Sequence, residues 1–332
     1  MSGNFVQRGE GAIFDKEKRA QAAVLCGADV VLELGAKYAV QTAEVFAENA
    51  IHILASIPEV KYLSFGAECS DIELIKNAAN LLVEENTAYK EELRRLLKTG
   101  VSYPRARQEA IIYAGYPQIA ETMSSPNNIL GIEYVKAILK NNYKIEPYLV
   151  KRKGAEHDSD EGADGILSAS KIRGLIQTKD KEKFLAIPKA ATDIFENAPI
   201  FDYKSFEKGV LANILMMSRD ELKKIAGATE GLENRIKDAA EKSKKLEELL
   251  DTVKTKRYAY SSLRRIVLSS YLKILEEEKH KTPSYIKVLD FSEKGREILN
   301  TIKNKHSVGD KIKLKINRNG QEKEITLTLQ EQ

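Results

Sequence analysis

Ala28-Asp29-Val30-Val31-Leu32-Glu33-Leu34 is the stretch that decides the fold class. It is short, apolar and rich in β-branched side chains, a pattern typical of a buried parallel strand. Helical spacing follows from Thr42 to Ala55, and a second strand pattern follows at Tyr62-Leu63-Ser64-Phe65, which ends at Gly66. Strand, helix and strand in this order predict a wound α/β sheet, with ligands bound beyond the carboxyl ends of its strands.

The segments around this core follow the same alternation. Asp15 to Gly27 has the spacing of an amphipathic helix, with Gly27 placed as its C-cap. Asp71 to Lys98 is predicted as one long helix, and Ile145 to Val150 as a further strand. Met1 to Gly11 is polar and glycine-bearing, which is typical of a loop.

Composition sets broader limits. The 332 residues, of which 42% are hydrophobic, are enough for one large or two ordinary domains with real cores. The net charge of +4 is mild, so a nucleic-acid role would depend on local clustering of cations. Cys26 and Cys69 give neither a disulfide framework nor metal-ligand spacing, which favours a reducing cytoplasm and no metal site. No apolar run approaches a membrane span, and the N-terminus lacks a signal-sequence pattern.

An unusual helix start lies at Ser168-Ala169-Ser170-Lys171-Ile172-Arg173-Gly174-Leu175. Helix N-termini carry unpaired N–H groups and a positive dipole end, so they normally attract acidic side chains. Here Ser168 or Ser170 can cap the helix, and Lys171 and Arg173 add positive charge. This arrangement suits a polyanion such as a phosphate chain, because arginine binds phosphate in a fork and serine hydroxyls complete the cradle. A solvated helix start with two exposed cations is the alternative.

Three motifs together carry a family resemblance. The runs Met1-Ser2-Gly3-Asn4-Phe5-Val6-Gln7-Arg8-Gly9-Glu10, Ser125-Pro126-Asn127-Asn128-Ile129-Leu130-Gly131 and Ser168-Ala169-Ser170-Lys171-Ile172-Arg173 resemble the tRNA(Met) cytidine acetate ligase family, relatives of the HIGH-signature nucleotidyltransferases. The resemblance covers residues 1 to 303 in consistent order. It implies a Rossmann-like ATP site followed by a helical tRNA-binding domain. Members use ATP to activate acetate as acetyl-adenylate, then transfer the acetyl group to N4 of the wobble cytidine of elongator tRNA(Met).

The resemblance assigns roles to individual residues. It implies that Lys171 and Arg173 act in catalysis by neutralising charge on the leaving pyrophosphate, together with Mg²⁺ that accompanies ATP. For Gly66 the alternative is a plain turn glycine, and for Asn127 and Asn128 it is a helix cap. For Arg152 and Lys153 the alternative is a solvated basic loop. The implied ATP ligands are Gly66, Asn127, Asn128, Arg152, Lys153, Ser168 and Ser170.

One family feature is missing from the sequence. The His-x-Gly-His signature, which in the family holds the triphosphate, occurs nowhere in this chain, and none of the 4 histidines has that spacing. Met1-Ser2-Gly3-Asn4 stands where other members already have a first strand and that signature behind them. We therefore expect a shortened first domain and impaired catalysis by this chain.

A basic and aromatic cluster marks the second half of the chain. Val210–Met217, Arg219–Ile225, Gly231–Thr252 and Ser261–Lys279 are periodic and charged, which predicts an all-helical domain. Within this domain, lysine and arginine side chains that can bind phosphates lie beside a tyrosine ring on which an unstacked base can stack. A solvated helix face balanced by nearby acids is the alternative. The predicted tRNA-binding residues are Lys254, Lys256, Arg257, Tyr258, Arg264 and Arg265.

The C-terminal tail departs from this pattern. Residues 309–316 and 324–329 alternate with period two around Arg318-Asn319-Gly320, which predicts a β-hairpin that resembles the closing strands of a PDZ domain. The predicted organisation is therefore α/β, with an incomplete Rossmann-like ATP-binding domain at 1–188, a helical tRNA-binding domain at 189–305 and a hairpin tail at 306–332.

Three functions remain open from the sequence. The first is the ATP-dependent ligase, with elongator tRNA(Met) and acetate as partners and no membrane association. The second is a catalytically impaired nucleotide- or RNA-binding remnant of such an enzyme. The third is a nucleotidyltransferase that acts on a small cofactor precursor, which would have no need of a basic helical domain. Oligomeric state and the residues that select acetate do not follow from the sequence.

Overall fold

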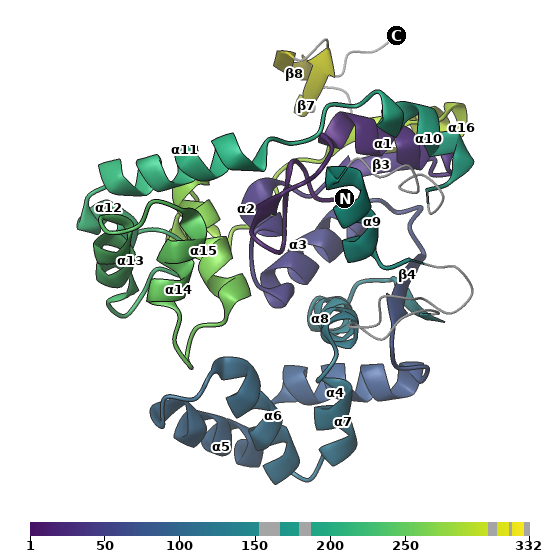
Figure 1. The fold of residues 1–332 in the computed structure, drawn as a ribbon. Coiled ribbons are helices and arrows are strands. Elements are labelled where there is room, and N and C mark those ends of the chain that lie inside the picture. The colour runs from purple at the N-terminus through teal and green to yellow at the C-terminus, as the bar shows by residue number, and fades with distance from the viewer. Residues whose placement is uncertain (153–166, 179–186, 305–310, 319–320, 329–332) are drawn as a thin grey trace.

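The computed structural model describes residues 1–152, 167–178, 187–304, 311–318 and 321–328 of the 332-residue chain. Figure 1 shows an α/β body at the N-terminal end, a lobe formed by α4 to α7 at the bottom, and a second helical lobe formed by α11 to α15 at the left. Within these described ranges, no helix is long and apolar enough to cross a membrane.

The centre of the α/β body is a parallel pair of strands. β4 (Tyr62–Ala67) pairs with β5 (Glu146–Lys151), and α3 (Ala43–Ala55) and α8 (Pro126–Lys140) pack against them. Leu63 of β4 shares a buried core with Ile51 and Ile138 of these helices. The parallel strand pair with intervening helices confirms the α/β fold class predicted from the sequence.

The first predicted strand has a different partner. β3 (Val30–Glu33) pairs antiparallel with β6 (Lys287–Phe291), a strand that the sequence reading missed. The prediction that β3 is a buried parallel strand is wrong, because only Val31 of its four residues is buried and its neighbour comes from the far end of the chain. Residues 287–304, which we expected in the helical domain, thus pair with and pack on the α/β body. The described strands form two-stranded sheets rather than one continuous sheet.

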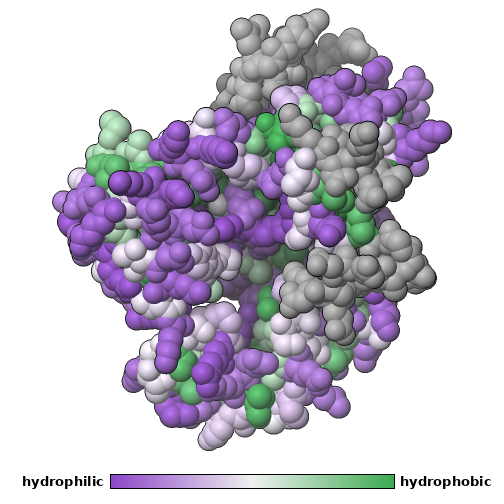
Figure 2. Space-filling view, in the orientation of Figure 1, coloured by the Kyte–Doolittle hydropathy of each residue, from purple (hydrophilic) through white to green (hydrophobic). Residues whose placement is uncertain are grey.

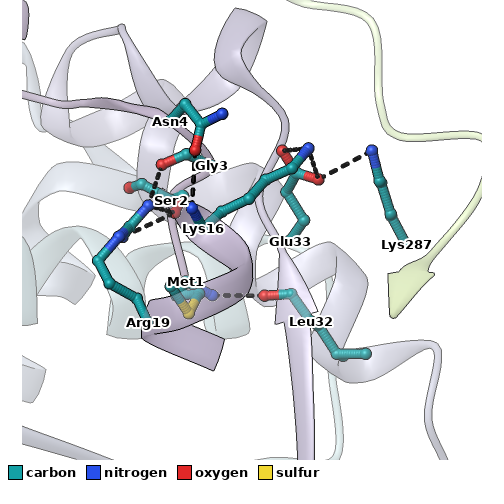
Figure 3. Close-up of polar contacts among 9 residues, drawn as sticks. All are labelled: Met1, Ser2, Gly3, Asn4, Lys16, Arg19, Leu32, Glu33 and Lys287. Carbon is teal, nitrogen blue, oxygen red and sulfur yellow. Dashed lines mark hydrogen bonds and ion pairs between the residues drawn. The ribbon is translucent and has the colours of Figure 1, made fainter. Parts of the chain in front are cut away.

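The first residues of the chain are fixed beside β3 by hydrogen bonds of Met1 to Leu32 and Leu34, and a charge cluster lies next to them (Figure 3). The carboxylate of Glu33 lies between Lys16 Nζ at 3.1 Å and Lys287 Nζ at 3.3 Å, and all three side chains are largely buried. Gly3 is packed so tightly against Glu33 that a Cβ atom would lie 2.2 Å from its carboxylate oxygen. Arg19 donates hydrogen bonds to the carbonyl groups of Ser2 and Gly3. Position 3 of the opening motif is therefore a glycine because a larger side chain would collide with Glu33.

The lower lobe contains two helices where one was expected. α4 (Ile72–Glu84) ends at Glu85, whose φ of 42° is left-handed, and α5 (Thr87–Lys98) begins after Asn86, whose side chain accepts from the Tyr89 N–H. The prediction of one helix over 71–98 is wrong at this turn. α6 (Tyr103–Tyr113) and α7 (Pro117–Thr122) complete the lobe.

A buried ion-pair cluster joins this lobe to the α/β body. Arg107 of α6 contacts Glu133 of α8 at 2.8 Å, and Lys136 contacts Glu133 at 2.8 Å and Glu44 of α3 at 2.7 Å. Glu133 is 2% exposed. Although burial acts to lower it, the negative charge of Glu133 raises the pKa of Arg107.

The helical lobe buries one continuous core. Ile214, Leu222, Leu249 and Leu263 are members of it. The predicted helix over 231–252 is interrupted, because Glu248 accepts the N–H groups of residues 244 and 245 and starts a new helix there. The elements of this lobe are α11 (Tyr203–Met216), α12 (Arg219–Lys223), α13 (Leu232–Ala240), α14 (Leu246–Val253), α15 (Tyr260–Leu272) and the 3₁₀ turn η3 (Glu276–Glu278).

The remaining elements cover the body and form the tail. In the tail, β7 and β8 pair antiparallel. The predicted first helix is confirmed, with Gly27 at a φ of +106° just after its C-cap. The remaining elements are β1 (Phe5–Val6), β2 (Glu10–Gly11), α1 (Lys16–Leu25), α2 (Ala36–Ala39), α9 (Ala169–Gln177), α10 (Lys189–Glu196), α16 (Glu293–Asn304), β7 (Lys311–Arg318) and β8 (Gln321–Thr328).

Candidate functional site

Predicted site residues meet at the carboxyl end of the β4–β5 pair. The backbone N–H of Arg152 donates to the carbonyl of Ala67 at 2.9 Å, so Arg152 continues the ladder past the strand end. Its side chain lies over Gly66, where an added Cβ would be 3.3 Å from Arg152 Cγ. Asn127, in the first turn of α8, donates from Nδ2 to Glu68 Oε1 at 2.6 Å, and Arg152 Nε lies 3.8 Å from the same oxygen. Gly66, Asn127 and Arg152 therefore form one polar group around Glu68.

Asn128 has a different role from its neighbour. Its Oδ1 accepts from the backbone N–H of Cys69 at 2.9 Å, and its Nδ2 donates to the carbonyl of Thr122 at 2.9 Å. The side chain is 5% exposed, so both polar ends are used inside the protein. Asn128 thereby fixes the loop after β4 to the segment before α8. The alternative that Asn127 or Asn128 caps α8 is wrong, because Ser125 is the N-cap.

The serine- and arginine-bearing motif begins α9. Ser168 is its N-cap and accepts from the backbone N–H of Lys171 at 3.1 Å. Arg173 donates to Ser170 Oγ at 2.9 Å, and Lys171 is exposed. Ser170 and Arg173 line a cavity of about 510 Å³ together with Arg8 of the N-terminal segment.

Side chains of both charge signs line this α9 cavity. Burial and the positive charge of Arg8 lower the pKa of Arg173. Arg264 of α15 makes an ion pair with Glu10 at the cavity wall. Tyr203 donates to the carbonyl of Gly11 at 2.8 Å, and burial, reinforced by Glu10, raises its pKa.

The predicted ATP ligands thus lie in two groups. None of Gly66, Asn127 and Arg152 lines the α9 cavity that holds Ser170 and Arg173. Lys153, the remaining predicted ligand, lies outside the described residues. Among the described residues, no group of three metal-ligating side chains is present, so a magnesium ion here would depend on substrate phosphates for most of its ligands.

The predicted RNA-binding cluster lines a second opening, which we call the interlobe cleft. It measures about 620 Å³ and lies between the helical lobe and the lower lobe, where Figure 2 shows the surface hollowed. Three of the cluster's cations lie over tyrosine rings. Lys254 Nζ is 4.8 Å and the Arg264 guanidinium 5.9 Å from the Tyr260 ring centre, and the Arg257 guanidinium is 5.9 Å from that of Tyr258. The predicted residues that line the cleft are Lys254, Lys256, Arg257, Tyr258 and Arg265.

Arg264 is the exception in this cluster. It lines the α9 cavity, whereas its neighbour Arg265 lines the interlobe cleft. Arg265 donates to Ser262 Oγ at 3.1 Å, and burial lowers its pKa. The structure therefore divides the predicted cluster between two faces of α15.

Several residues at these sites were missed from the sequence. Glu68, Arg8 and Tyr203 contact predicted ligands or line their cavity, and Tyr103 of the lower lobe lines the interlobe cleft. Arg8 lies in a quoted family motif, which was a usable signal. Tyr103 carries no local signal, because its place in the cleft depends on how the lobes pack.

Comparisons with known proteins show the family of this chain. The HIGH Nucleotidyl Transferase family model matches residues 1–332, a longer stretch than the residues 1–303 on which the resemblance rests. The tRNA(Met) cytidine acetate ligase of Acetivibrio thermocellus is 37% identical, over 95% of this chain and 80% of its own. That of Caldanaerobacter subterraneus is 39% identical, over 92% of this chain and 78% of its own.

Solved structures show the same fold. The crystal structure of Thermotoga maritima TmcAL without ligand matches with a TM-score of 0.84 and 34% identity, over 92% of this chain and 76% of that one. A second crystal form, bound with alpha-thio ATP, matches with the same TM-score and identity, over 92% of this chain and 75% of that one. The resemblance read from the sequence motifs is confirmed.

Proposed function

This chain belongs to the tRNA(Met) cytidine acetate ligase family of HIGH nucleotidyl transferases, and from that premise we propose that it uses ATP to attach acetate to N4 of the wobble cytidine in elongator tRNA(Met). The observation that carries the proposal is the meeting of Gly66, Asn127 and Arg152 at the carboxyl end of a parallel strand pair. Nucleotides bind at that edge in α/β sheets. A structural relative at 34% identity holds alpha-thio ATP.

Adenylation is the first proposed step. An acetate oxygen attacks the α-phosphorus of ATP, the bond to the β-phosphate oxygen breaks, and pyrophosphate leaves with acetyl-adenylate as the product. Such a reaction needs alignment and neutralisation of developing charge more than covalent help from the protein. Arg152 supplies positive charge at the strand end, which Gly66 leaves open to the nucleotide. Lys171 and Arg173 of α9, the catalytic cations that the resemblance implies, belong to the second group of predicted ligands. Mg²⁺ bound with ATP would neutralise further phosphate charge.

Transfer to RNA is the second proposed step. The exocyclic amine of cytidine attacks the acetyl carbon, AMP leaves, and the amine loses one proton. The base has to leave the anticodon stack to reach the adenylate, as enzymes that modify bases generally require. The cations of the interlobe cleft support the RNA side of this proposal, since backbone phosphates dominate nucleic-acid affinity. We place the reaction in the cytoplasm, where tRNA is used.

A labelling experiment tests this function. The full chain is incubated with radiolabelled acetate, ATP and Mg²⁺, with either elongator tRNA(Met) or a transcript whose wobble cytidine is replaced by uridine. We expect label in the elongator tRNA alone, recovered as N4-acetylcytidine after nuclease digestion. ATP should be required. Absence of label in the tRNA despite saturating substrates would contradict the proposal.

One observation favours a second candidate. Gly66, Asn127 and Arg152 do not line the cavity that holds Ser170 and Arg173, and this separation favours a nucleotide- and RNA-binding protein that does not catalyse the transfer. Under this alternative, equilibrium binding of ATP and of tRNA would be retained while no acetate is transferred. Binding and acetate-transfer assays on the same preparation therefore distinguish the two functions. A nucleotidyltransferase for a small cofactor precursor would show neither tRNA binding nor tRNA labelling.

A further inference from the structure

The α9 cavity lies where separate parts of the chain meet. The N-terminal segment and α9 contribute one part of its lining, and α11, α14 and α15 of the helical lobe contribute the rest. Its volume of about 510 Å³ falls in the range of small-ligand sites. A ligand in this cavity would therefore touch both the N-terminal segment and the helical lobe.

Two arginines without a carboxylate partner line the cavity from the N-terminal segment and α9. In the described part of the chain, the Arg8 side chain makes no ion pair or hydrogen bond, and Arg173 donates only to Ser170 Oγ at 2.9 Å. Burial and the positive charge of Arg8 lower the pKa of Arg173, so the two guanidinium groups lie within electrostatic range of each other. Like charges repel, and an anion bound beside both would relieve this repulsion.

Two carboxylates without a cation partner line the same cavity from the helical lobe. Glu207 of α11 and Glu247 of α14 are exposed, and neither side chain makes an ion pair or a hydrogen bond among the residues that the structure describes. The third acid of the lining, Glu10, is paired with Arg264. Glu247 lies in the first turn of α14, where negative charge is favourable in itself, so Glu207 is the stronger indication of a ligand.

Apolar side chains complete the lining between these charges. The hydroxyl of Tyr203 is held by the carbonyl of Gly11 at 2.8 Å, which fixes this half-buried ring at the cavity. A flat ring can lie on such an apolar surface while the few polar groups around it fix its orientation. The apolar lining residues are Phe206, Val210, Leu246, Leu250, Val267 and Leu268.

This pattern of charges fits a cytidine nucleotide. Its phosphate suits the arginines, because a guanidinium group binds phosphate oxygens in a fork. Its exocyclic amine suits the carboxylates, because glutamate accepts a hydrogen bond from N4 of cytosine. Uridine carries an acceptor oxygen at the same position, and a carboxylate repels it.

We propose that the α9 cavity binds the target cytidine of the RNA substrate. The phosphate of this nucleotide lies at Arg8 and Arg173, and its exocyclic amine donates to the carboxylate of Glu207. The inference rests on the proposed function, because it takes a cytidine in RNA as the substrate. Pyrophosphate leaves in the first step of that function, so Arg173 is available to the RNA phosphate in the second. Glu207 is then a residue that selects cytidine over uridine.

The position of α15 relates this cavity to the interlobe cleft. Arg264 of α15 lines the α9 cavity, and Arg265 lines the interlobe cleft. RNA that crosses α15 can therefore place the target base in the cavity while the phosphates of neighbouring nucleotides lie at the cleft.

A change of base at the wobble position tests the acidic part of the lining. Fluorescein-labelled anticodon stem-loops of elongator tRNA(Met) carry cytidine, uridine or N4,N4-dimethylcytidine at this position. Fluorescence anisotropy of the full chain at fixed salt measures their affinities. We expect the cytidine stem-loop to bind about tenfold more tightly than the other two, in line with the discrimination that one good base contact provides. The dimethylated base keeps the cytosine ring but has no N–H to donate.

Removing the two carboxylates should remove this preference. In the double variant Glu207→Gln, Glu247→Gln each amide can accept from cytidine or donate to uridine, so the preference for cytidine should fall from about tenfold to below about threefold. Glu207→Gln alone should cause most of this loss. The melting temperature should be unchanged, because neither carboxylate has a partner in the described part of the chain. Glu241→Gln is the control, since Glu241 is an exposed acid of the helical lobe outside the cavity lining, and it should keep the full preference.

A substitution of Arg8 tests the basic part of the lining. Arg8→Met should weaken the binding of the cytidine and uridine stem-loops alike by about tenfold, because phosphate contacts contribute affinity without reading the base. Lys208→Met is the matched control. Lys208 is an exposed cation next to Glu207 on α11 but outside the cavity lining, so this variant should bind both stem-loops as the unmodified chain does.

The outcomes distinguish this inference from the function on which it rests. If the chain labels or binds elongator tRNA(Met) but the double glutamate variant keeps the full preference for cytidine, the cavity proposal is overturned and the function stands. Normal stem-loop binding by Arg8→Met, or equal binding of the cytidine and uridine stem-loops by the unmodified chain, would overturn it in the same way. If the unmodified chain neither binds nor labels tRNA, both fall together.

Discussion

Arg264 and Arg265 are neighbours on α15, yet they occupy opposite situations. Arg264 faces the α9 cavity and is paired with Glu10. Arg265 faces the interlobe cleft and donates to the hydroxyl of Ser262, and burial lowers its pKa. The comparison teaches that a half-buried cation paired with a carboxylate contributes to the fold, whereas one without a carboxylate is available to an anionic ligand.

The largest effect should come from breaking a paired cluster. Glu133→Gln removes the charge that Arg107 and Lys136 share, and leaves the buried Arg107 uncompensated while Lys136 keeps Glu44. We expect a loss of about 3–5 kcal/mol in the free energy of unfolding, measured by urea titration with circular dichroism. Glu109→Gln is the control, since its exposed pair with Arg105 should be worth less than about 1 kcal/mol. Equal losses for both variants would contradict the distinction.

A substitution at the strand end should have a smaller effect, confined to the affinity for the nucleotide. Arg152→Ala removes a half-exposed cation beside Gly66 and Asn127. ATP affinity, measured by calorimetry, should fall about tenfold or more, as expected for a lost charge-assisted hydrogen bond. Lys144→Ala, an exposed cation before the opposite end of β5, is the matched control and should bind ATP normally. Unchanged ATP affinity in Arg152→Ala would remove this residue from the site.

The two neighbouring arginines themselves give a crossed test. Arg265→Met keeps most of the side-chain volume, so the melting temperature should hold or rise while tRNA affinity falls about tenfold. Arg264→Met leaves Glu10 without its partner, so the melting temperature should fall while tRNA affinity changes less than about threefold. Differential scanning fluorimetry and anisotropy together measure both. The same result for both variants would erase the contrast between the two faces of α15.

The smallest effect should appear as a pH dependence. Burial acts to raise the pKa of Glu44, but Lys136 outweighs it, so the pKa lies below its ordinary value of 4.5. The stabilisation is therefore full above pH 4.5 and is lost as the pH falls through the lowered pKa. Glu44→Gln should be less stable by under about 1 kcal/mol at pH 7, with a difference that disappears in acid. Urea titrations from pH 7 to about pH 3 measure it, with the exposed Glu84→Gln as control.

Local patterns predicted much of this fold. The strand at residues 62–65, the strand at residues 145–150 and the helix after Thr42 are present, because each depends on nearby apolar spacing and capping. The break at Glu85 was missed because the left-handed turn there uses glutamate and not glycine. β6 was missed because five residues between polar segments give little signal, and their partner lies at the other end of the chain.

The candidate sites were less predictable than the fold. Residue type and motif identified Asn127 and Arg152, and the structure brings them together around Glu68. No sequence pattern distinguishes Arg264 from Arg265, because their partners come from residues 10 and 262. Glu207 and Glu247 are ordinary residues in the sequence. Their place in one cavity with Arg8 is a property of the tertiary packing alone.

The antiparallel pairing of β3 with β6 has a consequence for how the chain is made. Val30 lies opposite Phe291, so an early strand lacks its neighbour until nearly 300 residues have been synthesised. Contacts at such sequence separation form slowly, because a long loop must first close. During translation, Glu33 also lacks Lys287, the second of its two lysines. The core of the helical lobe is drawn from residues 210–267, so it can form before β6 is made, and the arrival of β6 then completes the α/β body.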